Sequence, residues 1–242
     1  MDVSYADPAV ATFIVIPALL LIALVWGSMA AWRRGGARPQ ASSQAGLVVG
    51  AVAFVWMVGT WAAAQAGLFQ NWNRNLPPFA LLVAAIVVLS LVIAYSSVGS
   101  HLARFLPLWV LVAVQGFRLP LELAMHAMHQ RGIMPREMSY SGRNFDIVTG
   151  ATAIIVAVLV ARGLGGRRLV AVWNVVGLAL LVNVVTVAIL GTPRFQYFGN
   201  DRLNTWVTYP PFVWLPAVMV LAALAGHLII FRALRINVHG RR

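Results

Sequence analysis

The chain has 242 residues, of which 61% are hydrophobic and 10% charged, and its formal net charge is +12. Soluble domains carry about 25% charged residues, so this composition excludes an ordinary soluble protein and predicts that lipid surrounds most of the chain. The absence of cysteine excludes disulfides, thiolate metal sites and cysteine nucleophiles. Every basic residue is arginine, mostly beside an apolar run, which indicates membrane topology and anionic lipid rather than nucleic acid. Because there is no lysine, a retinal Schiff base is also excluded.

Seven apolar runs follow one another along the chain and predict an all-α polytopic membrane bundle, with residues 1–242 forming one domain. Each run reaches or approaches the roughly 20 residues that a helix needs to cross a bilayer, and nothing alternates with the period of a barrel strand. The fifth run is the shortest. The first follows two aspartates without a basic residue, so we expect a retained anchor rather than a signal peptide. The predicted spans are about 9–31, 45–67, 77–97, 105–128, 146–162, 169–191 and 210–231.

The arginines predict the orientation, because cytoplasmic loops carry an excess of positive charge. With the N-terminus outside and the C-terminus cytoplasmic, the inner side holds Arg33, Arg34, Arg38, Arg104, Arg162, Arg167, Arg168, Arg232, Arg235, Arg241 and Arg242. The outer side then holds Arg74, Arg131, Arg136, Arg143, Arg194 and Arg202. The two longer outer connections, 130–145 and 192–209, carry Gly, Pro, aromatic and charged residues, whereas the inner ones resemble plain arginine-anchored turns. Loop-borne function is therefore expected outside.

The fourth span, FLPLWVLVAVQGFRLPLELAMHAMH, carries a polar stripe: Gln115, Arg118, Glu122, His126 and His129. Steps of three and four residues place all five on one helix face. A lone charge at mid-membrane costs at least about 2.5–3.5 kcal/mol, so charged residues there normally face the bundle interior and are paired. Arg118 and Glu122 have the i, i+4 spacing that allows them to form an ion pair. Pro120 is expected to kink this helix.

Polar residues on neighbouring spans lie at a similar predicted depth. Arg143, Asn144 and Asp146 open the fifth span, and Asn183 lies in the outward half of the sixth. Each alone is typical of a helix cap or an interhelical hydrogen bond. Together they predict an outward-facing polar cavity around the fourth span, lined by Gln115, Arg118, Glu122, His126, Arg143, Asn144, Asp146 and Asn183.

This cavity leads to the main functional hypothesis, which is binding or transport of a small polar or anionic ligand, a proton or an ion. Arg118 would attract an anion, and Glu122 would titrate as a substrate or proton moves. One alternative is a structural or assembly subunit, in which Arg118 and Glu122 form an ion pair that fixes helix packing.

A second alternative is a metal site. Glu122, His126 and His129 are candidate zinc ligands of a membrane-embedded, hydrolase-like enzyme. The histidines and methionines between Met125 and Met138 would also suit copper. His227 stands alone in the seventh span, where it is expected to be a hydrogen-bonded packing residue at a different depth from His126.

Two stretches, FRLPLELAMHAMHQRGIMPREMSYSGRNFDIVTG and NTWVTYPPFVWLPAV, resemble an uncharacterised family of bacterial seven-span membrane proteins. The resemblance covers most of the chain from the fourth span onward. It implies a multi-pass protein of a bacterial cytoplasmic membrane. It implies no activity and assigns no role to any residue.

Overall fold

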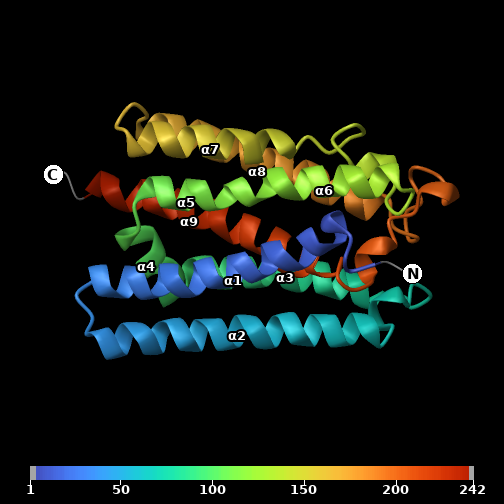
Figure 1. The fold of residues 1–242 in the computed structure, drawn as a ribbon, viewed down its shortest axis with the longest axis horizontal. Helices are drawn as coiled ribbons and strands as arrows, with labels where there is room; N and C mark the ends of the chain where they lie inside the picture. Colours follow the sequence, from blue (N-terminus) through green and yellow to red (C-terminus); the bar gives the residue numbers. More distant parts are fainter. Residues whose placement is uncertain (1–3, 240–242) are drawn as a thin grey trace.

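Long helices run side by side along the whole molecule in the computed structural model, which describes residues 4–239 (Figure 1). Asp2, Arg241 and Arg242 lie outside the described residues. The long helices are α1 (Pro8–Arg34), α2 (Pro39–Gln65), α3 (Pro78–Tyr95), α8 (Arg167–Leu190) and α9 (Leu221–His239). The fourth predicted span consists of α5 (Leu108–Val114), a 3₁₀ turn (Gln115–Phe117) and α6 (Arg118–Gln130). The shorter helices are α4 (Ser97–Phe105) and α7 (Ile147–Ala161).

The predicted all-α class is confirmed, and no strand occurs between residues 4 and 239. Six helices within these residues are long and apolar enough to cross a membrane, which indicates a membrane protein. They begin at Pro8, Pro39, Pro78, Leu108, Arg167 and Leu215. Proline starts the first three because its missing N–H costs nothing in the first helical turn.

The two ends of the bundle differ. The end that holds the N-terminus, here called the N-side, carries the connections 66–77, 131–146 and 191–214, and the opposite C-side carries the shorter ones (Figure 1). The inner connections were predicted to be plain turns. The one between α3 and α5 on the C-side is instead the amphipathic helix α4. In α4, His101 stacks on Trp32 of α1 at a centroid distance of 3.9 Å.

The fifth predicted span is a helix of only 15 residues, α7. At 1.5 Å per residue it covers about 22 Å, less than the roughly 30 Å of hydrocarbon. Irregular chain from Ser139 to Asp146 precedes it, with Ser139, Asn144 and Asp146 buried in protein. The backbone N–H groups of Gly142 and Asn144 donate to the carbonyl of Ser139. Such internal bonding allows non-helical backbone at membrane depth.

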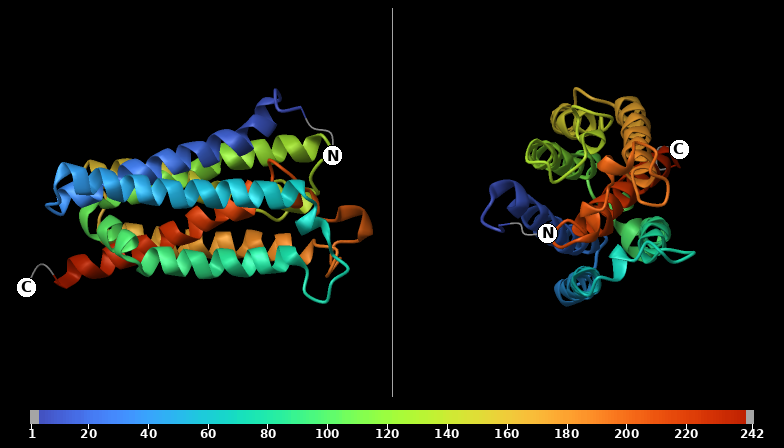
Figure 2. Two further views of the ribbon diagram at one scale, coloured as in Figure 1. Left: turned by 90° about the horizontal axis from the view of Figure 1, so that it is seen from below. Right: turned by 90° about the vertical axis from the view of Figure 1, so that its right-hand side faces the viewer.

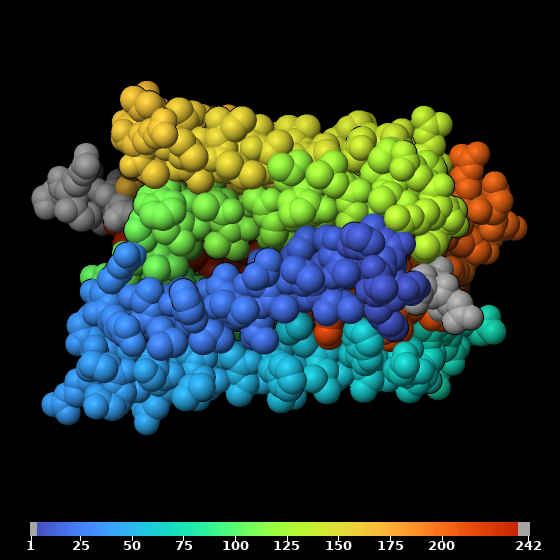
Figure 3. Space-filling view, in the orientation of Figure 1, coloured from blue at the N-terminus to red at the C-terminus, as the bar shows by residue number. Residues whose placement is uncertain are grey.

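Helix α9 is the centre of the bundle. It packs against α3, α4, α5 and α8, and α1, α5 and α6 cover most of it in the view of Figure 3. In Figure 2, α3 and α8 lie on opposite sides of it. A π-helical segment, Leu215–Val220, precedes α9 on the N-side and contains Pro216. The 3₁₀ turn at Gln115–Phe117 interrupts the neighbouring fourth span before Pro120 rather than at it. Irregular turns of both kinds recur at functional sites.

Candidate functional site

Arg118 lies at the start of α6, directly after the 3₁₀ turn, and its side chain is 1% exposed. Its Nε donates to Asp146 Oδ2 at 2.5 Å, and its Nη2 forms an ion pair with Asp146 Oδ1. Asp146 immediately precedes α7, where the helix N-terminus also favours a negative charge. This bidentate geometry is the strong form of the arginine–carboxylate pair. The predicted pairing of Arg118 with Glu122 is therefore wrong, because Asp146 takes up the guanidinium from across the helix interface.

The second partner of Arg118 is His227 of α9, which is fully buried. Arg118 Nη1 lies 2.8 Å from His227 Nε2, and His227 Nδ1 lies 2.8 Å from Asn174 Oδ1 of α8. Arginine has no acceptor, so Nε2 must accept and Nδ1 must carry the proton that it donates to Asn174. The hydrogen bonds thus assign a neutral imidazole. His227 is thus a buried, hydrogen-bonded residue, as the sequence predicted, and it meets Arg118 rather than His126, which lies about two turns further along α6.

Glu122 lies one turn further along α6 and is 2% exposed. Both of its carboxylate oxygens accept from Asn144 Nδ2, at 2.9 and 2.8 Å, and the same nitrogen lies 3.0 Å from the carbonyl of Met138. Asn144 Oδ1 accepts from the backbone N–H of Asp146 at 3.0 Å. The irregular chain before α7 therefore holds Glu122 and presents Asp146 to Arg118. Together these side chains and His227 and Asn174 form one polar network that joins α6, α7, α8 and α9.

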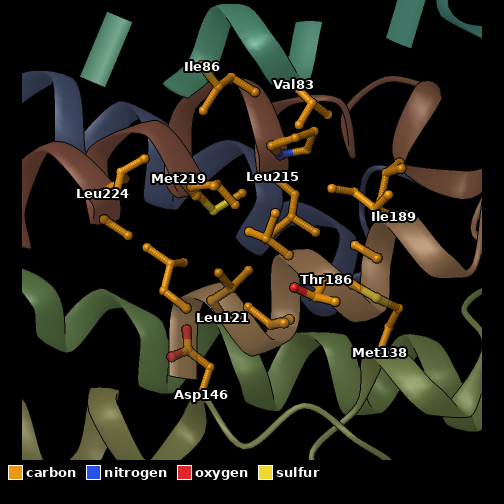
Figure 4. Close-up of a pocket in the computed structure, with 18 of the residues that line it drawn as sticks. Val83, Ile86, Leu121, Met138, Asp146, Thr186, Ile189, Leu215, Met219 and Leu224 are labelled. Carbon is orange, nitrogen blue, oxygen red and sulfur yellow. The ribbon is translucent and has the colours of Figure 1, made fainter. Parts of the chain in front are cut away.

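A cavity of about 210 Å³ lies beside this network in the N-side half of the bundle (Figure 4). Its walls come from α3, α6, α8 and the π-helical segment leading into α9, and they are mainly aliphatic, with Leu121, Leu215 and Met219 among them. Arg118, Glu122 and Asp146 line one part of it. The predicted polar cavity is thus corrected: the walls are mainly apolar, because α3, α8 and α9 turn their aliphatic faces toward it, and charge is confined to one part.

The other predicted pocket residues lie outside this cavity. Gln115 is buried against α9, where its Nε2 donates to the carbonyl of Ala223 at 3.3 Å. His126 Nδ1 lies 2.8 Å from Ser139 Oγ, and its ring stacks on Tyr140 near the N-side end.

Arg143 and Asn183 lie together on the outside of the bundle. Asn183 Nδ2 donates to the backbone carbonyl of Arg143 at 2.8 Å. The exposed guanidinium of Arg143 stands over the ring of Phe198, 5.2 Å from its centroid. Arg143 and Asn183 therefore contact each other, but they face away from the cavity.

The predicted metal set, Glu122, His126 and His129, does not converge. Glu122 binds Asn144, His126 faces Ser139, and His129 Nδ1 lies 3.4 Å from the carbonyl of Met134. In the described part of the chain, no three His, Asp or Glu side chains are placed to hold a metal ion. Glu122 and His129 are about two helical turns apart, too far to share an ion.

His227, Asn174 and Asn204 belong to the network or to the cavity lining but were not predicted as site residues. His227 was considered and set aside, and Asn174 and Asn204 were not singled out. Asn174 is one amide within a long apolar helix, which is itself a signal of an interhelical bond. Asn204 lines the cavity from a loop, is fully buried, and its Oδ1 has no hydrogen-bond partner. No sequence pattern marks a loop residue of this kind.

Comparison with curated proteins and with solved structures finds no significant match. A family described as a domain of unknown function, DUF8737, matches residues 43–235. The expected uncharacterised family is thereby supported, and the match reaches back into α2 rather than starting at the fourth span. Since it covers most of the chain, the protein belongs to the DUF8737 family.

Proposed function

We propose that this protein binds one small, mainly apolar molecule in the cavity between α3, α6, α8 and α9. The observation that carries the proposal is an aliphatic cavity of about 210 Å³ that meets Arg118, Glu122 and Asp146 along part of its wall. A mainly apolar pocket with a few convergent polar groups is the usual form of a small-molecule site. The π-helical segment and Phe117 of the 3₁₀ turn both line the cavity, which adds support.

An anionic ligand, the first expectation from sequence, is not favoured by this geometry. Arg118 is the cation beside the cavity, and Asp146 already neutralises it through two atoms. Adding an anion would place three negative groups around one guanidinium in a medium that screens charge poorly. The polar groups instead suit a ligand that is uncharged or donates hydrogen bonds.

We further propose that the chain crosses a bacterial cytoplasmic membrane seven times, with its N-terminus outside. The arginine distribution and the family resemblance support this orientation and compartment. For α7, support comes from its packing against α5, α6 and α8 and from the internally bonded chain that continues it to the N-side. The ligand cavity then lies in the outward half of the bilayer.

Filling the cavity tests the binding proposal. Val220 lines the cavity and is half-buried, whereas Val172 faces outward on α8 and is 65% exposed. We expect native mass spectrometry to find about one bound small molecule per chain in the wild type and in Val172→Trp, and none in Val220→Trp. Equal small-molecule content in all three folded proteins would contradict the proposal.

A structural role is the second candidate, and one observation favours it: the polar network ties four helices together through Arg118, Asp146, His227 and Asn174. Buried polar groups of this kind can fix one packing arrangement without binding anything. The charge-pair variants described in the Discussion separate this role from ligand binding.

A further inference from the structure

The cavity opens sideways, between α3 and α8. Both helices pack along α9, and in the right-hand view of Figure 2 they lie on either side of it. Cavity residues at this opening are also exposed at the molecular surface, with Val87 of α3 at 45% and Val182 of α8 at 58%. Figure 4 shows Val83 and Ile86 of α3 across the cavity from Thr186 and Ile189 of α8. On apolar helices of this length, such a surface faces lipid.

The polar groups around the cavity are mainly acceptors. Glu122 and Asp146 supply two carboxyl groups against the one guanidinium of Arg118, and the network holds His227 neutral. Two carboxylates and one guanidinium leave one negative charge, which is costly in a membrane unless a proton or another cation offsets it. Asn204 Oδ1 adds a buried acceptor without a partner. A ligand that fits this wall carries a positive charge and hydrogen-bond donors.

Size sets a third condition. An apolar cavity of about 150 Å³ holds one benzene molecule, so the cavity of about 210 Å³ holds roughly a ring with a short chain, or the first part of a longer chain. A longer chain would leave through the opening between α3 and α8, where Val87 and Val182 meet lipid. The space therefore accommodates an amphiphile whose tail stays in the bilayer.

We propose that the cavity takes a single-chain amine amphiphile from the bilayer through the opening between α3 and α8, with its ammonium group at Glu122. This inference rests on the proposed function, because it specifies the class of molecule that the cavity binds. The carboxylate of Glu122, held by Asn144, would accept from the ammonium beside the Arg118–Asp146 pair. No chemical change of the ligand is required.

Photoaffinity labelling in phosphatidylcholine nanodiscs tests the proposal, with a dodecylamine that carries a diazirine in its chain. We expect labelled peptides from the cavity walls, including Leu121 and Met219, and displacement of the probe by dodecylamine at concentrations at least about tenfold below those of dodecanol or dodecanoate. A tenfold preference is the size of one hydrogen bond to a charged group. Glu122→Gln, which keeps the shape and can still accept from Asn144, should abolish this preference.

Paired valine variants test the route of entry. Val87 and Val182 line the opening, whereas the exposed valines Val88 on α3 and Val175 on α8 do not line the cavity. We expect Val87→Trp and Val182→Trp to lower cavity labelling at least about fivefold, and Val88→Trp and Val175→Trp to leave it unchanged, with circular dichroism as the folding control.

Each outcome supports or overturns a stated part. Equal competition by dodecanoate would overturn the amine head group while leaving an apolar ligand in place. Unchanged labelling in Val182→Trp would overturn lateral entry. Absence of cavity labelling, with wild-type small-molecule content lost in Val220→Trp, would overturn the amphiphile alone; absence of both would overturn the proposed function as well.

Discussion

The guanidinium of Arg118 touches two partners inside an apolar helix bundle, and the pair with Asp146 is its only bidentate contact among the described residues. Arg118→Met leaves the carboxylate of Asp146 buried without its cation, and losing one partner of a buried pair costs about 3–5 kcal/mol. We expect that loss in unfolding by sodium dodecyl sulfate from dodecylmaltoside micelles. Adding Asp146→Leu should restore at least half of it, since no charge is then stranded. A double variant no more stable than the single one would contradict this account.

The same double variant separates structure from binding. If it folds but retains no cavity ligand, the charges serve binding; if it keeps the wild-type ligand content, they serve packing alone. In this double variant His227 loses its hydrogen bond from Arg118 but keeps Asn174 as its partner. The contact between α8 and α9 is therefore expected to remain.

The N-terminal end of α1 should respond to acid. Arg131 Nη1 donates to Asp7, and this bond, together with one from the Ala9 backbone, holds the pKa of Asp7 below its ordinary value. A lowered folded-state pKa gives stability that is present above the unfolded value of about 4 and is lost as pH falls through the folded value. We expect Asp7→Asn to lower Tm slightly at neutral pH, and the difference from the wild type to shrink as pH falls below the ordinary aspartate value of about 4. A Tm difference that stays constant as the solution is acidified would contradict the role of this pair.

At the scale of elements, the contact between α6 and α7 depends on Gly150. A Cβ at this position would lie 2.8 Å from the carbonyl carbon of Arg118 and 2.9 Å from the Cα of Leu119, so backbone would have to move. Small residues allow such close approach of membrane helices. We expect Gly150→Ala to cost about 1–3 kcal/mol, and Gly59→Ala in α2, where a Cβ meets nothing within 4 Å, to cost nothing. Equal stability of the two variants would show that α7 shifts freely.

Sequence predicted the helices well because apolar runs of membrane length are a strong signal, and the inward face of the fourth span followed from the spacing of Gln115, Arg118 and Glu122. It placed Asp146 in the same pocket as Arg118 but favoured Glu122 as the ion-pair partner. Spacing along one helix reports only local pairs, whereas Asp146 reaches Arg118 through the packing of α7 on α6.

The contact of His227 with Arg118 was missed for the same reason, because the two side chains belong to different helices, α9 and α6. The shape of the irregular chain before α7 could not be predicted from hydrophobic periodicity either. Hydrogen bonds among its own backbone groups and with the Asn144 side chain define that shape. The partners of a buried polar residue thus require tertiary structure even where its helix and face do not.

For the whole molecule, the proposed seven-span topology predicts which loops meet which solution. The chain has no cysteine, so single cysteines can be introduced without background. Asn75, Ser141 and Leu164 are exposed connection residues, and the last two flank α7. We expect a membrane-impermeant maleimide to label Asn75→Cys and Ser141→Cys in cells whose outer barrier is opened, and Leu164→Cys only after the cytoplasmic membrane is disrupted.

The pair around α7 carries most of the information. Opposite accessibility of Ser141→Cys and Leu164→Cys would mean that a 15-residue helix crosses the bilayer, with the irregular chain from 139 to 146 completing the span inside protein. Labelling of both from the same side would reduce the crossings to six, and it would remove Asp146 from membrane depth. The buried ion pair of Asp146 with Arg118 would then need a different explanation. If Asp146 reached Arg118 from the aqueous edge of the membrane, the internally bonded chain that holds Asp146 would not be required.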